Sequence, residues 1–274
     1  MQKKHDVMRS ASRPDHQPLR RSGLIAALTV TWAGPWLAQA QSPTRVKIAA
    51  ASNLKFVLAD LTSQYRQETG AQIDVNLGAS GNLARQILQG LPVEQFISAD
   101  EVWVAELVKA GRTTDAGQRY ATGRLALVVP KKSALPVAQG LAAVVRAMKP
   151  GDKFAIANPA LAPYGLAATE ALQRAGVGPL PAHQKVMGDN IGQATQFVAT
   201  GAAQAGITAL ALAQAPEIAP SLQVLPLPAD LHAPLHQRMV LLKGAGAAAA
   251  DWHRFLLSPT AQAVFVRHGY ALPQ

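Results

Sequence analysis

The sequence predicts an α/β protein in which mostly parallel strands alternate with helices. Three observations indicate this fold class. Short apolar runs alternate with segments of helical periodicity, glycines stand where the helical segments end, and the strand–helix pattern starts again near residue 125. No long linker separates the two halves. We therefore expect two α/β lobes, joined by strands that cross between them.

The elements expected in the first half follow from the spacing of apolar residues. Residues 45–51 read as a strand buried on both faces, because Val46, Ile48 and a run of alanines leave no polar face. Asp100 is expected to cap the helix that carries Trp103. The pattern predicts a helix from residue 54 to Gly70, a strand at 73–77, a helix over 83–88 ended by Gly90, a short strand at 96–97, and a helix over 103–108 closed by Gly111.

The second half repeats this alternation and then returns to the first lobe. The pattern predicts strands at 125–129, 154–157, 205–209, 224–227 and 239–242, helices over about 164–175 and 190–200, and two final helices that carry Trp252 and Phe265. We expect the lobes to be joined near residues 125–130 and 224–239. The first lobe then comprises residues 41–126 plus 225–274, and the second comprises residues 127–224.

The first forty residues read as a cleaved export signal. A basic leader precedes an uncharged, mostly apolar stretch over 23–37, and Ala38-Gln39-Ala40 has the small-x-small pattern of a signal-peptidase site. A membrane anchor is the alternative, but the stretch is shorter than the roughly 20 apolar residues that span a bilayer. We expect cleavage before Gln41.

Composition restricts the classes of function that the exported chain can have. Removing the six basic and two acidic residues of the signal from the chain's 26 and 16 leaves a net charge of +6. These charges are scattered rather than gathered in a stripe, so no nucleic-acid partner is expected. The chain has no cysteine, which excludes disulfides, thiolate metal sites and a cysteine nucleophile.

Four strand-to-helix junctions carry small or polar residues, and they form the candidate site. They are Ser52-Asn53, Ser80-Gly81, residues 163–165 and Asn190-Ile191. Ligands of open α/β sheets lie beyond the carboxyl ends of the strands, where helix starts offer unpaired N–H groups and a positive dipole end. Each junction alone is more often an ordinary cap. Together they predict a site for a small oxyanion.

The donor set of this site predicts its selectivity. Neither serine-bearing start has a cation in its first turn, so serine hydroxyls, main-chain N–H groups and the phenol of Tyr164 would hold the anion. A site with donors and no acceptor rejects an anion that keeps a proton at neutral pH, such as hydrogen phosphate, because that proton finds no partner.

Other patterns are weaker candidates. Residues 78–81 are one residue short of the G-x-S-x-G nucleophile motif and lack Asp and His partners in order, which disfavours a serine hydrolase. His232 and His236 have the i, i+4 spacing of metal ligands, but Pro234 lies between them and favours solvated loop histidines. Trp103 and Trp252 lie on apolar helical stripes typical of core residues.

At these junctions the chain resembles the periplasmic molybdate-binding proteins of ABC transporters, the ModA family. The resemblance covers residues 44–274 and is carried by AAASNL (49–54), LGASGNLARQI (77–87), FISAD (96–100), NPALAPYG (158–165), GDNIGQA (188–194) and SPTAQAVFVRHGYAL (258–272). It implies a type II periplasmic-binding-protein fold that captures molybdate, and commonly tungstate, in its cleft. It further implies a periplasmic monomer that delivers the anion to an inner-membrane ABC permease, without cofactor or catalysis.

The resemblance also implies roles for individual residues. Ser52 and Ser80 match the family's two hydroxyl donors, and Asn53 matches an asparagine that one branch uses beside the first donor. The remaining matches are Tyr164 for a ligand-contacting tyrosine, Ile191 for a residue that gives its backbone N–H, and Ala99 for a further backbone contact. Molybdenum would be bound only as the oxyanion, with no protein ligand to the metal.

Two departures and two alternatives remain. Ala209 stands where another branch has a ligand tyrosine, so any phenol contact would come from Tyr164. Glu94-Gln95 replaces the more usual Asp before the FISAD strand, a change that we expect to be harmless. The chain could bind sulfate or another small oxyanion or organic anion instead, and an enzyme on this scaffold would show turnover that depends on Ser80.

Overall fold

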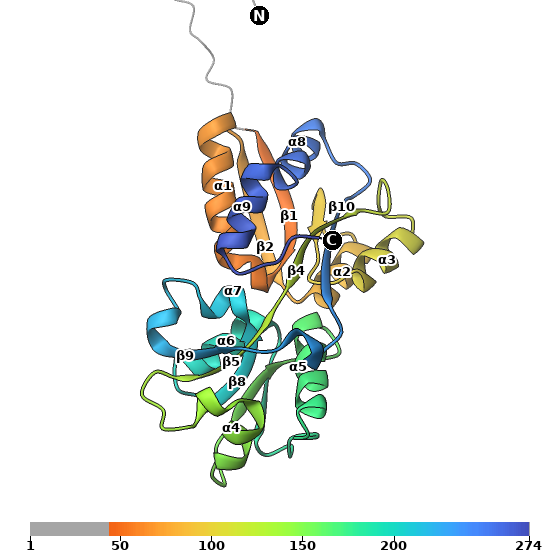
Figure 1. The fold of residues 1–274 in the computed structure, drawn as a ribbon. Coiled ribbons are helices and arrows are strands. Elements are labelled where there is room, and N and C mark those ends of the chain that lie inside the picture. Colours follow the sequence, from red (N-terminus) through yellow and green to blue (C-terminus); the bar gives the residue numbers. More distant parts are fainter. Residues whose placement is uncertain (1–43, 274) are drawn as a thin grey trace, which may run out of the picture. The chain divides into compact units, whose positions relative to one another are not determined.

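The structure is a computed structural model that describes residues 44–273. The expected export signal and its cleavage before Gln41 lie outside the described residues. Within them the chain forms two five-stranded sheets flanked by helices (Figure 1), which confirms the predicted two-lobe α/β fold class. None of the helices in the described range combines the length and the apolar character needed to cross a bilayer.

The first sheet has the strand order β2-β1-β3-β10-β4. Its strands are β1 (Arg45–Ala51), β2 (Gln72–Gly78), β3 (Gln95–Ile97), β4 (Gln118–Gly123) and β10 (Leu235–Leu241). β1 is parallel to β2 and β3, whereas β10 is antiparallel to both β3 and β4. The first lobe is therefore completed by a strand from the C-terminal part of the chain.

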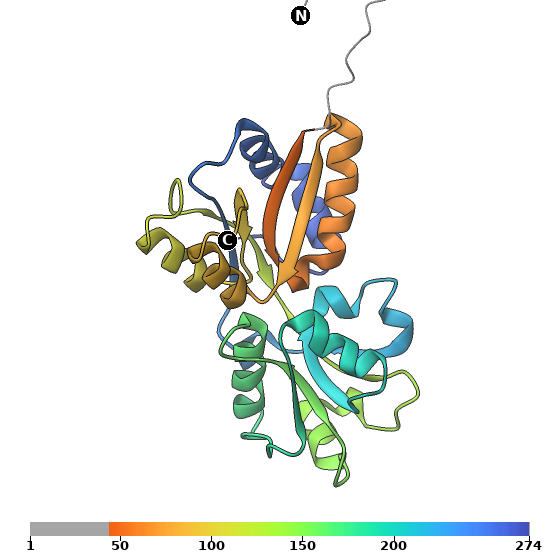
Figure 2. The ribbon, with the colours of Figure 1, turned by 180° about the vertical axis from the view of Figure 1, so that it is seen from behind.

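Helices cover this sheet on both faces. α1 (Lys55–Thr69), α8 (Ala247–Leu256) and α9 (Pro259–Arg267) lie together along β1 and β2 (Figures 1 and 2). There the ring of Tyr65 meets that of Trp252 edge-on, with 5.1 Å between centroids. α2 (Ser80–Leu88) and α3 (Val102–Lys109) pack through Leu83 and Val104 around Phe96 of β3. These apolar stripes were the basis of the predicted helices.

The second sheet has the order β7-β6-β8-β5-β9. Its strands are β5 (Leu125–Pro130), β6 (Phe154–Ala157), β7 (Lys185–Gly188), β8 (Ala205–Ala209) and β9 (Leu222–Pro226), and its helices are α4 (Leu141–Ala147), α5 (Pro163–Arg174), α6 (Ile191–Ala199) and α7 (Leu210–Ala213). β6 is parallel to β7 and β8, and β5 is antiparallel to β8 and β9. Both lobes thus place an antiparallel strand inside a mainly parallel sheet.

The chain crosses between the sheets at two places of unequal length. It leaves the first sheet after Gly123 and enters the second at Leu125, and it returns between Pro226 and Leu235. The sequence prediction assigned Leu125 and Ala126 to the first lobe. The structure pairs them with β8 and β9, so β5 belongs wholly to the second sheet. Residues 125–129 are all apolar, so the sequence does not show at which residue one lobe ends, and this explains the difference. Leu225 and Pro226, which the prediction also assigned to the first lobe, pair with β5 and belong to the second sheet as well.

Some elements have no counterpart in the sequence prediction. They are β4, β7, α4 and α7. The β4 sequence, QRYATG, is largely polar, and β7 is only four residues long, so neither shows an apolar run. Gly70 ends α1 in the left-handed conformation at φ 73°, as expected.

Candidate functional site

A small cavity lies among the four helix starts that the sequence analysis singled out. It measures about 10 Å³, room for about one water-sized group. It is lined by Ala51, Ser52, Asn53, Gly78, Ala79, Ser80, Ala99, Ala162, Pro163, Tyr164 and Ile191. All six residues predicted to contact the ligand are among these, and they come from both lobes.

Strand register explains why these residues meet. β1 and β2 are parallel and pair Ala51 with Gly78, so the two strands end side by side and their next helices start at Ser52 and Ser80. The second lobe repeats the arrangement, because β6 and β7 pair Ala157 with Gly188 just before α5 and α6. Carboxyl ends of neighbouring parallel strands thus deliver four helix starts to one place.

Both serine hydroxyls accept a hydrogen bond from a backbone N–H. Ser80 Oγ accepts from Ala99 N at 3.0 Å, and Ser52 Oγ accepts from Gly192 N at 3.3 Å. A hydroxyl that accepts such a bond still has its own proton to donate. Each serine can therefore donate to an anion in the cavity.

Helix geometry supplies further donors. Ser80 and Ile191 are the first residues of α2 and α6, and Tyr164 is the second residue of α5. Backbone N–H groups at these positions have no acceptor within their own helix, and the dipole makes these ends positive. Gly81 is not such a donor, because its N–H bonds Leu161 O at 2.9 Å. The cavity is thus lined by residues with oriented, uncharged donors.

The side chain of Asn53 is already engaged. Its Nδ2 donates to Gln237 Oε1 at 3.1 Å and to Tyr270 Oη at 3.0 Å. Its Oδ1 is buried and has no partner among the described residues. The donor that Asn53 has left for an anion is its backbone N–H, in the short 3₁₀ helix η1 (Ser52–Leu54).

The hydroxyl of Tyr164 bonds a residue outside the cavity lining. Tyr164 Oη accepts from Gln237 Nε2 at 2.9 Å, and a Cβ added at Gly123 would come within 2.3 Å of it. Neither Gly123 nor Gln237 lines the cavity. Burial raises the pKa of Tyr164 above its ordinary value, so the phenol stays protonated. The phenol contact with the anion stays a prediction, because Tyr164 Oη accepts from Gln237 at the joint between the lobes and still has its own proton to donate.

Several residues at the site escaped the sequence analysis. Gly192, which donates to Ser52, directly follows a predicted site residue and could have been included. Gln237 stands in an antiparallel strand, where nothing local marks it. Lys55 begins α1 and lines a second cavity of about 280 Å³ that shares Ser52 with the first. We expected no cation in the first turn after either serine. Lys55 follows Ser52 closely, so this expectation does not hold on the Ser52 side.

The remaining candidates have structural roles in the described residues. Asp100 Oδ1 accepts from Trp103 N at 3.3 Å at the start of α3, but the N-cap position is held by Glu101, one residue later than expected, and burial raises the pKa of the Asp100 carboxyl. Asn190 Oδ1 caps α6 by accepting from Gln193 N at 3.1 Å. Trp252 is fully buried between α1 and α8. Residues 44–273 contain no cluster of three or more His, Cys, Asp or Glu side chains that could hold a metal.

Comparison with known proteins gives concordant matches. Residues 46–271 match the family model described as bacterial extracellular solute-binding protein. The molybdate-binding protein ModA of Azotobacter vinelandii is 34% identical over 90% of this chain and 98% of its own length. The ModA protein of Rhodobacter capsulatus is 33% identical over 93% and 97% of the two chains. The solved structure of the Azotobacter vinelandii periplasmic molybdate-binding protein superimposes with a TM-score of 0.75 at 30% identity, over 84% of this chain and all of that one.

Proposed function

Because the chain belongs to the bacterial extracellular solute-binding proteins and, among them, to the ModA family, we propose that it binds molybdate in the cavity between the four helix starts. The observation that carries this proposal is the convergence of two serine hydroxyls and several first-turn N–H groups on one cavity. Oriented neutral donors at helix starts are well suited to an oxyanion. None of the eleven lining residues is Lys, Arg or His, so fixed dipoles rather than ion pairs would balance the charge.

The number of donors is sufficient for tight binding. A hydrogen bond to a charged acceptor contributes about 1.5–3 kcal/mol. Two hydroxyls and the N–H groups of Asn53, Ser80, Tyr164 and Ile191 would together contribute about 9–18 kcal/mol. The upper part of this range leaves the roughly 8 kcal/mol of net binding energy that micromolar affinity needs after the cost of association. Tungstate, with the same charge and shape, would bind through the same donors.

Entry of the anion requires motion of the lobes. The cavity has room for about one water-sized group, whereas a tetrahedral oxyanion is larger. Two hydrogen bonds close it across the lobes, from Gly192 N to Ser52 Oγ and from Gly81 N to Leu161 O. We propose that these contacts separate to admit the anion and that the lobes then close on it.

The wider role follows from the family. ModA relatives are molybdate-binding proteins, and the related solved structure is periplasmic. We propose that this chain is exported by cleavage of its first forty residues, works as a monomer in the periplasm, and passes molybdate or tungstate to an inner-membrane ABC permease. It would act without a cofactor and without catalysis, since the hydroxyl of Ser80 accepts a backbone N–H rather than facing a base.

Isothermal titration of the chain that begins at Gln41 tests the ligand. We expect sub-micromolar affinity for molybdate and tungstate and negligible heat with sulfate. Absence of molybdate binding would overturn the proposal, and tight binding of sulfate alone would favour the alternative of a sulfate-binding protein.

Phosphate is the informative fourth ligand. A lining with donors only would exclude hydrogen phosphate, whose proton needs an acceptor. Asn53 Oδ1 is a buried acceptor without a partner among the described residues. We expect no phosphate binding at pH 7. Phosphate affinity comparable to that for molybdate would identify Asn53 Oδ1 as an acceptor in the site and contradict selectivity by donors alone.

A further inference from the structure

A buried glutamine lies at the joint between the lobes. Gln237 is fully buried on β10, at the point where the pairing of β10 with β4 shifts register. Its Oε1 accepts from Asn53 Nδ2 at 3.1 Å and lies 2.6 Å from Tyr120 Oη, whose one proton is shared with Ser98 O at 2.9 Å. Its Nε2 donates to Tyr164 Oη at 2.9 Å. Both ends of the amide are used, one as an acceptor and one as a donor.

These bonds join parts of the chain that belong to different lobes. Asn53 and Tyr120 belong to the first lobe, in η1 and β4, whereas Tyr164 belongs to α5 of the second. The joint is tight, because a Cβ at Gly123, the last residue before the crossing, would lie 2.5 Å from Gln237 Nε2. α5 and β10 are in direct contact. The amide therefore connects the lobes where the chain itself passes between them.

The same amide holds two residues of the anion site. Asn53 and Tyr164 both line the cavity, and both are bonded to Gln237 through their side chains. Asn53 Nδ2 is engaged by this bond, whereas Tyr164 Oη accepts and keeps its own proton, and each residue also has a backbone N–H at a helix start. One glutamine that does not line the cavity thus bonds a lining residue from each lobe.

We propose that Gln237 is a positioning residue for lobe closure. Its amide holds the start of α5 against η1, in the register that brings the N–H of Tyr164 to the anion and lets Gly192 meet Ser52. This inference rests on the proposed anion-binding function for its effect on affinity, but its effect on the arrangement of the lobes is independent of the ligand.

The bonding pattern explains why neither a carboxylate nor an apolar side chain would serve. Glutamate would lack the Nε2 donor to Tyr164 Oη and would bring a charge into a buried position. Leucine would remove both functions, leaving Tyr120 and Tyr164 without this partner. A buried polar group that loses its partner destabilises the fold, so a control is needed that separates lost stability from lost positioning.

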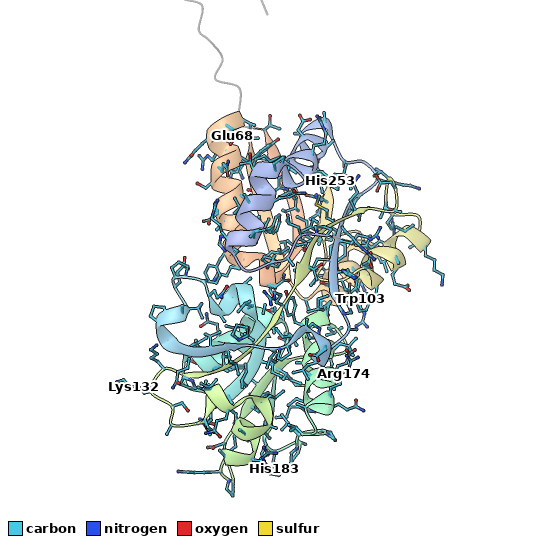
Figure 3. The ribbon with its side chains drawn as sticks, viewed as in Figure 1. Glu68, Trp103, Lys132, Arg174, His183 and His253 are labelled. Carbon is cyan, nitrogen blue, oxygen red and sulfur yellow. The ribbon has the colours of Figure 1, made fainter. Side chains whose placement is uncertain are left out.

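The chain offers a matched control in Gln95. This glutamine is also fully buried, on β3 next to β10. Its Nε2 contacts His253 Nδ1 at 2.9 Å and Met239 Sδ at 3.5 Å, all within the first lobe. Figure 3 labels His253 on α8. Gln95→Leu removes a buried amide of the same size from the same sheet without touching the joint between the lobes.

Ligand kinetics provide the first test. Gln237→Leu should lower the melting temperature of the unliganded protein more than Gln95→Leu, because both ends of the Gln237 amide are bonded whereas Gln95 Oε1 has no partner among the described residues. Only Gln237→Leu should accelerate dissociation of molybdate, by roughly fivefold to tenfold, which corresponds to one hydrogen bond. Tyr164→Phe, which removes only the hydroxyl, should have a similar effect, and combining it with Gln237→Leu should add little. Equal dissociation rates in Gln237→Leu and Gln95→Leu would overturn the proposal.

A measurement without ligand separates this proposal from the proposed function. The chain has no cysteine, so Glu68→Cys on α1 and Lys132→Cys after β5 give two unique labelling sites, both exposed (Figure 3). Spin labels there report the distance distribution between the lobes. We expect a broader distribution in Gln237→Leu than in the parent or in Gln95→Leu. An unchanged distribution would overturn the positioning role, whereas absence of molybdate binding by the parent would overturn only the proposed function.

Discussion

The two serines that mark the site look alike in the sequence but are held differently in the structure. Ser80 Oγ takes its hydrogen bond from Ala99 N, 19 residues away in the same lobe. Ser52 Oγ takes its bond from Gly192 N, 140 residues away in the other lobe. One hydroxyl is therefore oriented within its lobe before any ligand arrives, and the other is oriented only when the lobes meet.

The Ser80 half is supported by a firmly tied loop. Ser98 O accepts from Tyr120 Oη at 2.9 Å, and Ser98 Oγ donates to Asp100 Oδ1 at 3.0 Å. Glu101 Oε1 accepts from Arg119 and Arg238. The loop that carries the N–H of Ala99 is thus anchored at both ends. The difference teaches that one side of the site is a fixed receptor and the other is a closing contact.

Ser80→Ala should have the largest effect in binding studies. It removes a donor to a charged ligand, so molybdate affinity should fall roughly 10–150-fold. It also leaves the buried N–H of Ala99 without its partner, which should lower the stability of the unliganded protein. Calorimetric titration and thermal unfolding measure the two effects. A loss of affinity with unchanged stability would contradict the pre-oriented role of this serine.

Ser52→Ala should lower affinity with little change in stability. In the proposed complex its hydroxyl also donates to the anion, and we expect a loss of roughly tenfold. The N–H that it accepts comes from the opposite lobe and can bond to water once the lobes separate. We expect the unliganded variant to unfold at the same temperature as the unliganded parent protein. A loss of stability as large as that of Ser80→Ala would remove the distinction between the two halves.

Glu101→Gln should lower the free energy of unfolding by an amount that depends on pH, because Glu101 anchors the loop of the Ser80 half. Hydrogen bonds from Arg119, together with those from Arg238, hold the pKa of Glu101 at about 2, below its ordinary value of 4.5. The folded protein therefore gains stability from this carboxylate above pH 4.5 and loses it as the pH falls toward 2. We expect the variant to melt a few degrees lower at pH 7, with the two proteins converging near pH 2.

The control for this experiment is an isolated ion pair. Asp74→Asn removes the 3.4 Å contact with Arg45, whose side chain is 60% exposed. Exposed pairs contribute little to stability, so this variant should melt close to the parent at every pH. Equal effects of the two substitutions on the melting temperature would show that Glu101 stabilises the loop no more than an exposed ion pair does.

Lys55→Gln should produce the smallest change, confined to the closing side. Lys55 lines the larger cavity that shares Ser52. It is positioned to attract an anion before closure, so its loss should slow association several-fold at low salt and leave dissociation unchanged. Stopped-flow measurements against ionic strength test this, with Lys109→Gln on α3 as a charge-matched control. A change in dissociation rate would show that Lys55 contacts the bound anion.

Much of the fold and part of the site could be predicted because their signals are local. Apolar periodicity located most helices and strands, and Ser52, Ser80 and Ile191 stand at helix starts that sequence alone reveals. The partners of the site could not be predicted in this way. Gln237 meets Tyr164, Tyr120 and Asn53 from 73, 117 and 184 residues away, and none of these separations leaves a pattern in the sequence.

The position of the Tyr164 hydroxyl shows the same limit. The sequence identified the residue correctly as part of the cavity lining, but the direction of its side chain depends on the space left by Gly123. Backbone contributions follow from where a helix begins, whereas side-chain contributions depend on packing between segments that are distant along the chain.

The hydrogen bonds that the two serine hydroxyls accept connect the site to the backbone peptide groups of Ala99 and Gly192. Each forms a chain in which a backbone N–H donates to a hydroxyl and that hydroxyl can donate to the anion. Bonds in such a chain polarise one another, so the negative charge of a bound anion would be dispersed over the peptides of Ala99 and Gly192. Because no charged side chain lines the cavity, the dissociation rate of the anion from the closed protein should depend only weakly on ionic strength, unlike that from a site built from ion pairs.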